Sequence, residues 1–313
     1  MPRIAYLSWP PREISGGIKV AFQHVEMLVE AGFQAVIAAA DAQRPDWFDT
    51  KAEVIGFDAI RKDDVLVFPE NNPRFLAAFE GSGQPKVVFC QNAFFAHQGL
   101  GARPSYADYG VTHIMAPSMS VVQFCTQRFP GLKIGYTPFF IDHAKFRFTS
   151  AKTLQVAAVP RKRTIEFGAI VDLLRARHPQ LGEVPWVVLH GVTEQQVAEG
   201  MMRSAVFLSL ARLEAHSLTI LEAMACGCIC AGFTGVFGGN DSSTAKNGFW
   251  ALEDDVLGAV DQLANAIWLV RAGGESYRLV QEEGRFTAKA YNREESARRL
   301  VNFWEDFGLS PRT

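Results

Sequence analysis

The sequence has no apolar run long enough to cross a membrane and no excess of charge of either sign. Its 31 lysine and arginine residues nearly balance its 33 aspartate and glutamate residues, which gives a formal net charge of −2. A membrane-spanning helix needs about 20 mainly apolar residues, and nonspecific binding to nucleic acid needs a strongly basic surface. The composition therefore predicts neither a transmembrane helix nor a nucleic-acid partner.

Cysteine is scarce, with five residues in a chain of 313. An odd number in so long a chain argues against a disulfide scaffold and favours a reducing compartment. Cys226, Cys228 and Cys230 alternate along the chain, which is a spacing that also occurs in metal sites. Their neighbours are apolar, however, and free cysteine packs as a small hydrophobic residue, so we predict that they are buried.

The N-terminal residues lack the layout of a signal peptide, and we expect a cytoplasmic protein.

Two common nucleotide-binding motifs are absent as well. There is no G-x-G-x-x-G, which argues against a dinucleotide-dependent dehydrogenase, and no G-x-x-x-x-G-K-[ST] phosphate loop. What the sequence does contain is a regular alternation of strand-like and helix-like segments. Strands are expected at residues 3–9, 33–40, 54–57, 65–69, 86–90, 112–116, 134–140, 154–159, 186–190, 206–210 and 228–233.

This succession of strand–helix units predicts mainly parallel, doubly wound sheets. Residues 1–145 and residues 150–291 each hold enough units for a domain, and the polar stretch 141–152 between them is typical of a hinge. Residues 292–313 are expected to form a helix that crosses back to the first domain. The predicted fold class is thus α/β, with two Rossmann-like domains whose carboxyl strand edges face a cleft.

Glu214 and Glu222 lie eight positions apart, in the loop and the helix that join two expected strands. A helix that starts near Ser217 directs backbone N–H groups and positive dipole charge toward a ligand at the carboxyl edge of the sheet. Both carboxylates can reach one such ligand and bind its hydroxyl groups. The alternative is a chance pair of solvated glutamates. Glu222 lies among apolar neighbours, however, where an unpartnered carboxylate is costly to bury, so we expect it to face a cleft or a partner.

Two further segments follow expected strands and suit an anion. Gly16 and Gly17 allow close approach of the backbone to a phosphate, or they form an ordinary turn. Arg161, Lys162 and Arg163 place three cations together, which suits a diphosphate, or they form a solvated basic turn.

Two other loops carry candidate ligand-binding residues. The glycine-rich segment 235–241 contains Gly238 and Gly239 and lies on the same edge as the two glutamates. His97 follows a strand of the first half, where a histidine can serve a sugar hydroxyl, a phosphate or only solvent. His216 is a candidate donor contact with the same alternatives.

The segment from Glu214 to Cys230 resembles the signature of a known family. It is similar to the Glu-x7-Glu pattern E-G-F-G-L-x-x-x-E-A-M-A-x-G-x-P-V of retaining glycosyltransferases of family 4, which have the two-domain architecture called GT-B. The glycine pair at 16–17, the segment 138–146 and the cations at 160–163 also match this family in type and position, so that the resemblance covers nearly the whole chain.

The resemblance implies a role for each candidate residue. Glu214 would hold hydroxyl groups of the donor sugar near the reacting carbon, and Glu222 would bind the ribose of the nucleotide. Arg161, with Lys162 or Arg163, would neutralise the leaving diphosphate. Further donor contacts are expected from Gly16, Gly17, His216, Ser217, Leu218, Gly238 and Gly239, and His97 is a further catalytic candidate.

The resemblance also implies an activity. The chain would transfer a sugar from a nucleotide-sugar donor to a glycan or lipid-linked saccharide, with retention of anomeric configuration and with neither a cofactor nor an essential metal. The absence of an Asp-x-Asp motif agrees with independence of a metal. Such an acceptor places the protein in the cytoplasm and allows peripheral association with the inner face of the membrane.

Two alternatives remain open at this point. The first is a sugar-nucleotide epimerase or hydrolase of the same architecture, for which His97 and His216 are the candidate acid and base groups. The second is a non-catalytic nucleotide-sugar-binding protein. This chain has Ala215-His216-Ser217 where the family usually has Gly-Phe-Gly, which permits such a loss of activity.

Overall fold

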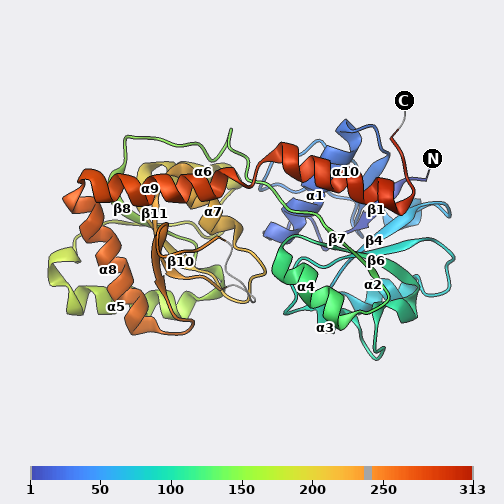
Figure 1. Cartoon of the computed structure of the whole chain (residues 1–313), viewed down its shortest axis with the longest axis horizontal. Helices are drawn as coiled ribbons and strands as arrows, with labels where there is room; N and C mark the ends of the chain where they lie inside the picture. The colour runs from blue at the N-terminus through green and yellow to red at the C-terminus, as the bar shows by residue number, and fades with distance from the viewer. Residues whose placement is uncertain (1, 236–241, 312–313) are drawn as a thin grey trace. The chain divides into compact units, whose positions relative to one another are not determined.

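The computed structural model describes residues 2–235 and 242–311, which divide into two compact units. Unit 1 comprises Met1–Phe139 and Arg293–Thr313, and unit 2 comprises Phe140–Asn292. Each unit is built around one parallel sheet with helices packed against it (Figure 1). The C-terminal segment therefore belongs to the unit that contains the N-terminus.

Unit 1 contains a seven-stranded sheet in the order β3-β2-β1-β4-β5-β6-β7. Its strands are β1 (Ile4–Leu7), β2 (Ala35–Ala38), β3 (Val54–Ile55), β4 (Val65–Pro69), β5 (Lys86–Phe89), β6 (Val111–Ala116) and β7 (Lys133–Tyr136). All neighbouring strands pair in parallel. Because the order reverses between β1 and β4, the carboxyl ends of these two strands form the kind of switch point where open α/β sheets bind ligands.

Two helices of unit 1 begin at residues whose side chains cap them. Ser118 accepts a hydrogen bond from the N–H of Val121 at the start of α4, and Asn72 accepts one from the N–H of Phe75 at the start of α2. Helix α10 packs beside α1 (Figure 1), and its Trp304 is fully buried. The helical segments are α1 (Gly16–Glu30), η1 (Phe57–Ala59), α2 (Pro73–Ala78), α3 (Ala96–Gly99), η2 (Tyr106–Tyr109), α4 (Met119–Arg128) and α10 (Arg293–Phe307).

Unit 2 contains a five-stranded parallel sheet in the order β12-β11-β10-β8-β9, which reverses between β8 and β10. Its strands are β8 (Thr153–Ala158), β9 (Trp186–Val188), β10 (Ser204–Leu210), β11 (Ile229–Phe233) and β12 (Gly248–Ala251). Its helical segments are η3 (Pro160–Lys162), α5 (Thr164–Arg177), η4 (Pro179–Leu181), α6 (Glu194–Arg203), α7 (Leu218–Cys226), α8 (Val256–Ala272) and α9 (Gly274–Lys289).

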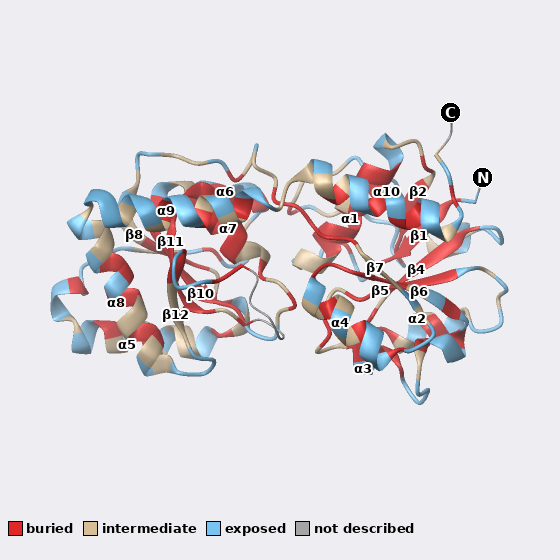
Figure 2. Ribbon diagram, in the orientation of Figure 1, coloured by how far each residue is buried: buried red, intermediate tan, exposed pale blue. Residues whose placement is uncertain are grey.

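The central strands of unit 2 are buried on both faces. Every residue of β10 and of β11 is buried, and Figure 2 shows both strands inside the unit. Strands that are covered by helices on both faces consist of continuous apolar runs rather than an alternation, which is why the sequence signals them so clearly. The loops that follow β10 and β11 therefore start from well-packed strands.

Helix α7 connects β10 to β11. Its residues from Ile220 to Cys226 are all buried, and it ends at Gly227, which has a φ of 84°. The N–H of Cys228 bonds to the carbonyl of Ala223, and the N–H of Gly227 bonds to that of Met224, which is the Schellman arrangement. This termination lets β11 begin directly after the helix.

The structure confirms the prediction of two α/β domains with parallel sheets. It also confirms that Cys226, Cys228 and Cys230 are buried, and it shows that Cys90 and Cys125 are free and buried as well. Strand β12 is absent from the expected strands, because it is only four residues long and follows a glycine-rich loop. The strand expected at 206–210 begins two residues earlier, at Ser204.

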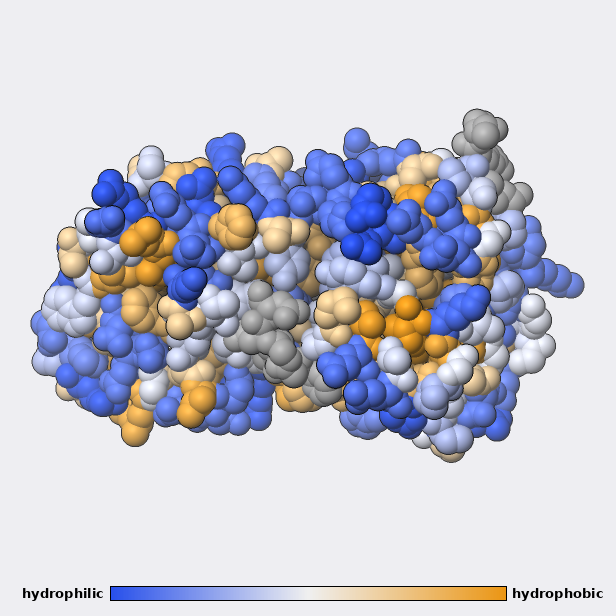
Figure 3. Space-filling view, in the orientation of Figure 1, coloured by the Kyte–Doolittle hydropathy of each residue, from blue (hydrophilic) through white to orange (hydrophobic). Residues whose placement is uncertain are grey.

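The surface carries apolar side chains singly or in small groups. On the face shown in Figure 3, hydrophobic residues form separate patches among hydrophilic ones. Trp9 and Met119 of unit 1 and Ile165 and Leu252 of unit 2 are among the exposed large side chains, and scattered exposure of this kind is normal for folded domains. Within the residues that the structure describes, no helix combines the length and apolar character that a membrane span requires.

Candidate functional site

The candidate site of unit 2 lies at the switch point between β8 and β10. Lys162 follows β8 and Glu214 follows β10, and Lys162 Nζ lies 2.6 Å from Glu214 Oε1. Lys162 Nζ also donates a hydrogen bond to the carbonyl oxygen of Arg212 at 3.0 Å. The pairing of β8 with β10 thus brings together two residues that the sequence marks out separately, one for a diphosphate and one for a sugar.

Burial and neighbouring positive charges have opposite effects on the pKa of the Glu214 carboxyl group. Burial raises its pKa, whereas the charges of Lys162 and Arg161 act in the opposite direction and lower it. The side chains of Lys162 and Glu214 are each 25% exposed. The ion pair therefore offsets part of the cost of burying Glu214 and still leaves both groups within reach of a ligand.

The backbone around Glu214 is constrained on both sides. The N–H of Glu214 donates to the carbonyl oxygen of Gly235 at 2.6 Å. Leu213, the preceding residue, has a φ of 50°, in the left-handed region that residues other than glycine seldom adopt. A conformation of this kind persists only where the surrounding bonds enforce it.

The start of α7 lies just beyond Glu214. Ser217 occupies the N-cap position without a side-chain hydrogen bond to the backbone, and its hydroxyl lies 3.2 Å from that of Thr219. The first N–H groups of any α-helix lack partners within the helix itself and form its positive end. His216 packs its ring against that of Tyr291, with centroids 4.9 Å apart. The first turn of α7, at Ser217 and Leu218, is thus the positive end of the helix.

Glu222 lies inside unit 2. It is 4% exposed and belongs to the stretch of α7 in which every residue is buried. This burial excludes the alternative that Glu222 is simply a solvated surface residue. Its role as a ribose contact remains a prediction.

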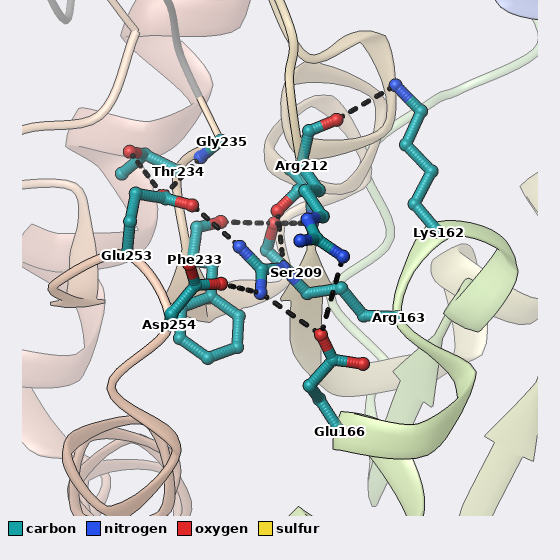
Figure 4. A network of polar contacts seen from close by, with 11 residues as sticks. Lys162, Arg163, Glu166, Ser209, Arg212, Phe233, Thr234, Gly235, Glu253 and Asp254 are labelled. Carbon is teal, nitrogen blue, oxygen red and sulfur yellow. Dashed lines mark hydrogen bonds and ion pairs between the residues drawn. The ribbon is translucent and has the colours of Figure 1, made fainter.

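The three clustered cations have different settings. Arg161 is exposed and Lys162 is half-buried, whereas the side chain of Arg163 is 1% exposed. Figure 4 shows the Arg163 guanidinium among carboxylates from two other segments, with Glu253 and Asp254 at 2.7 and 2.5 Å. Arg163 was expected among the cations that bind the diphosphate. Its N–H groups are instead directed to acceptors within unit 2.

The glycine-rich loop after β11 is described only at its two ends. Gly235 has a φ of 65°, and a Cβ atom at this position would lie 2.6 Å from the backbone of Ala211 and Arg212. Only glycine fits so close an approach without a shift of the backbone. The predicted donor contacts Gly238 and Gly239 lie outside the described residues.

The predicted residues of unit 1 lie in two places. Gly16 and Gly17 open α1, and the side chain of Gln91, which follows β5, donates to the carbonyl oxygen of Gly17 at 3.0 Å. This contact places the glycine pair at the carboxyl edge of the sheet. His97 is exposed on the short helix α3. The structure does not bring His97 into contact with Gly16 or Gly17 through any described hydrogen bond.

Trp9 and Glu70, which were not candidates from the sequence, lie at the switch point of unit 1. Trp9 is 38% exposed, and its Nε1 donates to Asn71 Oδ1 at 3.2 Å. Glu70 is buried, and burial raises the pKa of its carboxyl to about 7. Glu70 directly follows the strand expected at 65–69, and this position was the signal that could have identified it.

Within the described ranges, no cluster of three or more histidine, cysteine, aspartate or glutamate side chains is arranged to hold a metal ion. The acidic groups near Glu214 are instead paired with arginine and lysine. Glu166, for example, lies 3.4 Å from Arg163 and 3.9 Å from Arg212.

No protein-family model matches the chain. An alpha-1,6-glucosyltransferase of Actinobacillus pleuropneumoniae serotype 7 (strain AP76) is 28% identical over 244 residues, which make up 74% of this chain and 72% of that protein. Sucrose-phosphate synthase from Thermosynechococcus elongatus is similar in structure, with a TM-score of 0.71 at 14% identity over 98% of this chain and 99% of that one. Anabaena HepE in complex with UDP-glucose gives a TM-score of 0.70 at 13% identity over 97% and 99% of the two chains.

The fold of this chain is therefore the two-domain α/β fold of GT-B glycosyltransferases. At identities of 13–14%, the similarity to the solved structures establishes the fold alone. The relative at 28% identity adds support for glycosyltransferase activity.

Proposed function

We propose that this chain is a retaining glycosyltransferase that uses a nucleoside-diphosphate sugar as donor and a saccharide as acceptor. The observation that carries the proposal is the contact between Lys162 and Glu214 at the switch point of unit 2. A cation and a carboxylate at the start of a buried helix suit a ligand that is anionic at one end and rich in hydroxyl groups at the other.

The roles proposed within unit 2 rest on this arrangement and on the family resemblance. Lys162 and Arg161 neutralise the diphosphate, together with the N–H groups at the first turn of α7. Glu214 accepts hydrogen bonds from hydroxyl groups of the donor sugar. Glu222, on the second turn of the same helix, accepts hydrogen bonds from the ribose. Gly16 and Gly17 of unit 1 keep the role that the family resemblance implies, and His97 of unit 1 remains a catalytic candidate.

The chemical step breaks the bond between the anomeric carbon and the diphosphate oxygen. The electron pair of this bond leaves with the diphosphate, whose growing negative charge Lys162 and Arg161 stabilise. An acceptor hydroxyl oxygen forms the new bond to the same carbon, and its proton passes to a diphosphate oxygen. Retention requires that the acceptor approach from the face from which the diphosphate leaves.

UDP is the first nucleotide to test. HepE and the pneumococcal O-GlcNAc transferase GtfA were solved with UDP, and both share the fold. Thermal unfolding should be followed with UDP, GDP, ADP, CMP and dTDP, each with and without Mg²⁺. A ligand at about 100 times its dissociation constant adds about 2.7 kcal/mol of stability, which moves the midpoint by several degrees.

The outcome separates the proposal from its alternatives. A shift with one nucleoside diphosphate, followed by transfer of sugar to a saccharide with an unchanged anomeric configuration in the NMR spectrum of the product, supports the proposal. Release of free sugar or epimerisation of the donor indicates a hydrolase or an epimerase. Binding without turnover of any donor indicates a non-catalytic binding protein.

The acceptor is proposed to be a glycan or a lipid-linked saccharide. This part of the proposal rests on the family resemblance, and the transfer assay tests it directly with free oligosaccharides and with lipid-linked ones. Binding to vesicles with and without the lipid-linked acceptor tests whether the protein associates peripherally with a membrane. Transfer to free saccharides alone, with no binding to vesicles, would argue against the lipid-linked acceptor.

A further inference from the structure

We infer that Arg163 is a positioning residue, whose buried guanidinium fixes the main chain at Glu214 through Glu253 and Gly235. The inference rests on the proposed function for the role of Glu214. The contacts that carry it lie entirely within unit 2 and are independent of any ligand.

The guanidinium of Arg163 is surrounded by acceptors. Nε donates to the carbonyl oxygen of Ala211 at 3.0 Å, Nη2 donates to Glu253 Oε2 at 2.7 Å, and Nη1 donates to Asp254 Oδ1 at 2.5 Å. The ring of Phe233 lies beneath it, with the guanidinium carbon 4.3 Å from the ring centroid. Arg163 follows β8, and its partners follow or end β10, β11 and β12, so that one side chain ties together the carboxyl ends of four strands (Figure 4).

A series of hydrogen bonds leads from this guanidinium to Glu214. Glu253 binds Arg163 through Oε2, and its Oε1 accepts a hydrogen bond from the N–H of Gly235 at 2.7 Å (Figure 4). The carbonyl oxygen of Gly235 in turn accepts the N–H of Glu214 at 2.6 Å. Arg163 also holds Ala211, which precedes Glu214 by three residues. The loop that carries Glu214 is therefore held at Ala211 and at Glu214 itself.

The backbone on this route is strained in two places. Leu213, next to Glu214, has a φ of 50°, and Asp254, next to Glu253, has a φ of 62°. Residues other than glycine keep such angles only where the surrounding contacts enforce them. The bonds of Arg163 are contacts of this kind, and their loss should release the segment at Leu213 first.

An arginine is required for this arrangement rather than any cation. Its planar fork supplies separate N–H groups in fixed directions to Ala211, Glu253 and Asp254, whereas the ammonium group of a lysine is a single point of charge. Arg163→Lys should therefore keep the charge and lose the geometry.

Two carboxylates of the same network allow a sharp comparison. Glu253 binds both Arg163 and Gly235, whereas no described hydrogen bond joins Asp254 to Gly235. If Arg163 acts through Gly235, Glu253→Ala should disturb Glu214 and Asp254→Asn should not. If the network only adds ionic stabilisation to unit 2, the two variants should behave alike.

The experiment is amide hydrogen exchange of the full-length chain, resolved on peptides that span 209–217. We expect Arg163→Lys and Glu253→Ala to speed exchange in this segment by about three- to tenfold, which is the range for loss of one net hydrogen bond. Asp254→Asn should change the rate by less than about twofold. Arg177→Lys makes the same substitution at an exposed arginine, paired with Asp261 at the other end of α5, and is the control for a general effect of the change.

Binding of UDP and the rate of transfer give a second readout. A positioning role predicts that Arg163→Lys lowers kcat while the dissociation constant of UDP stays within about twofold. A loss of UDP affinity as large as that of Lys162→Ala would make Arg163 a ligand and would overturn the inference. Equal exchange rates in all of the variants and the wild type would also overturn it.

The two proposals can fail separately. If the wild-type chain binds no nucleotide and transfers no sugar, the proposed function fails, while the exchange rates still decide whether Arg163 fixes the segment at Glu214. If transfer is found and the exchange rates do not respond to Arg163→Lys or Glu253→Ala, the proposed function stands and the positioning role does not.

Discussion

Lys162 and Glu214 neutralise each other at the switch point of unit 2, with 2.6 Å between Nζ and Oε1. A diphosphate that binds Lys162 must compete with the carboxylate of Glu214. Replacement of Glu214 by alanine removes this competitor and one negative charge. We therefore expect Glu214→Ala to bind UDP as tightly as the wild type or up to about fivefold more tightly, which corresponds to about 1 kcal/mol for a partly exposed ion pair.

The same change should nevertheless reduce transfer, because the sugar loses its carboxylate contact near the reacting carbon. The expected loss in kcat is on the order of a hundredfold, measured in parallel with calorimetric titration of UDP. Glu199→Ala, on the exposed face of α6, serves as the control. A loss of UDP affinity that matches the loss of activity would contradict this division of roles.

Glu222→Gln should weaken the binding of UDP, because the ribose hydroxyls lose a charged acceptor. The expected loss is about 1–3 kcal/mol, or roughly five- to 150-fold in affinity. The matched measurement uses 2′-deoxy-UDP and 3′-deoxy-UDP. To the wild type, at least one of these deoxy ligands should bind less tightly than UDP. To the variant, the same ligand and UDP should bind about equally tightly. If both deoxy ligands bind as tightly as UDP to the wild-type chain, Glu222 is not the ribose contact.

The sequence predicted those features of the fold that depend on local patterns. The buried strands β10 and β11 appear as continuous apolar runs, and Gly227 marks the end of α7. Glu214 is recognisable because it follows a strong strand signal and precedes a helix. The resemblance of this segment to a known family further narrowed its function.

The sequence could not reveal which carboxylates neutralise Arg163. Glu253 and Asp254 lie about 90 residues further along the chain, and only the order of strands in the sheet brings them to Arg163. Three adjacent cations look alike in the sequence, although burial separates Arg163 from Arg161 and Lys162. For the same reason the buried carboxyl of Glu70 was missed, since its environment is formed by residues distant in the sequence.

Gly235→Ala should destabilise unit 2 by about 2 kcal/mol or more. Alanine would have to adopt the positive φ of this position, and its Cβ atom would also clash with neighbouring backbone. The Cβ would lie 2.6 Å from the backbone of Ala211 and Arg212. Gly191 is the matched control, since its φ of 68° is similar and no atom lies within 4 Å of an added Cβ. Gly191→Ala should cost about 1 kcal/mol, from strain alone. Urea unfolding of the two variants measures the difference in their free energies of unfolding. Equal losses of stability would show that a Cβ atom at Gly235 meets no steric conflict.

Glu70 should make unit 1 less stable as the pH rises from 5 to 8. Burial raises the pKa of its carboxyl from 4.5 to about 7, although backbone N–H groups at Glu70, Gln91 and Asn92 act to lower it. Between these two values the folded state therefore holds a proton that the unfolded state has lost. For this group the stability is highest below about pH 4.5, falls as the pH rises from 4.5 to 7, and levels off above 7. The shift corresponds to at most about 3 kcal/mol.

Glu70→Gln removes this titration and keeps the shape of the side chain. The stability of the variant relative to the wild type should therefore rise between pH 5 and pH 8, by up to about 3 kcal/mol. Hydrogen exchange of peptides from β1 and β4 reports on unit 1 separately from unit 2, and Glu80→Gln, at a partly exposed carboxylate paired with Arg103, is the control. If the difference between Glu70→Gln and the wild type is the same at pH 5 and pH 8, the carboxyl of Glu70 is ionised throughout this range, and the backbone N–H groups around it outweigh its burial.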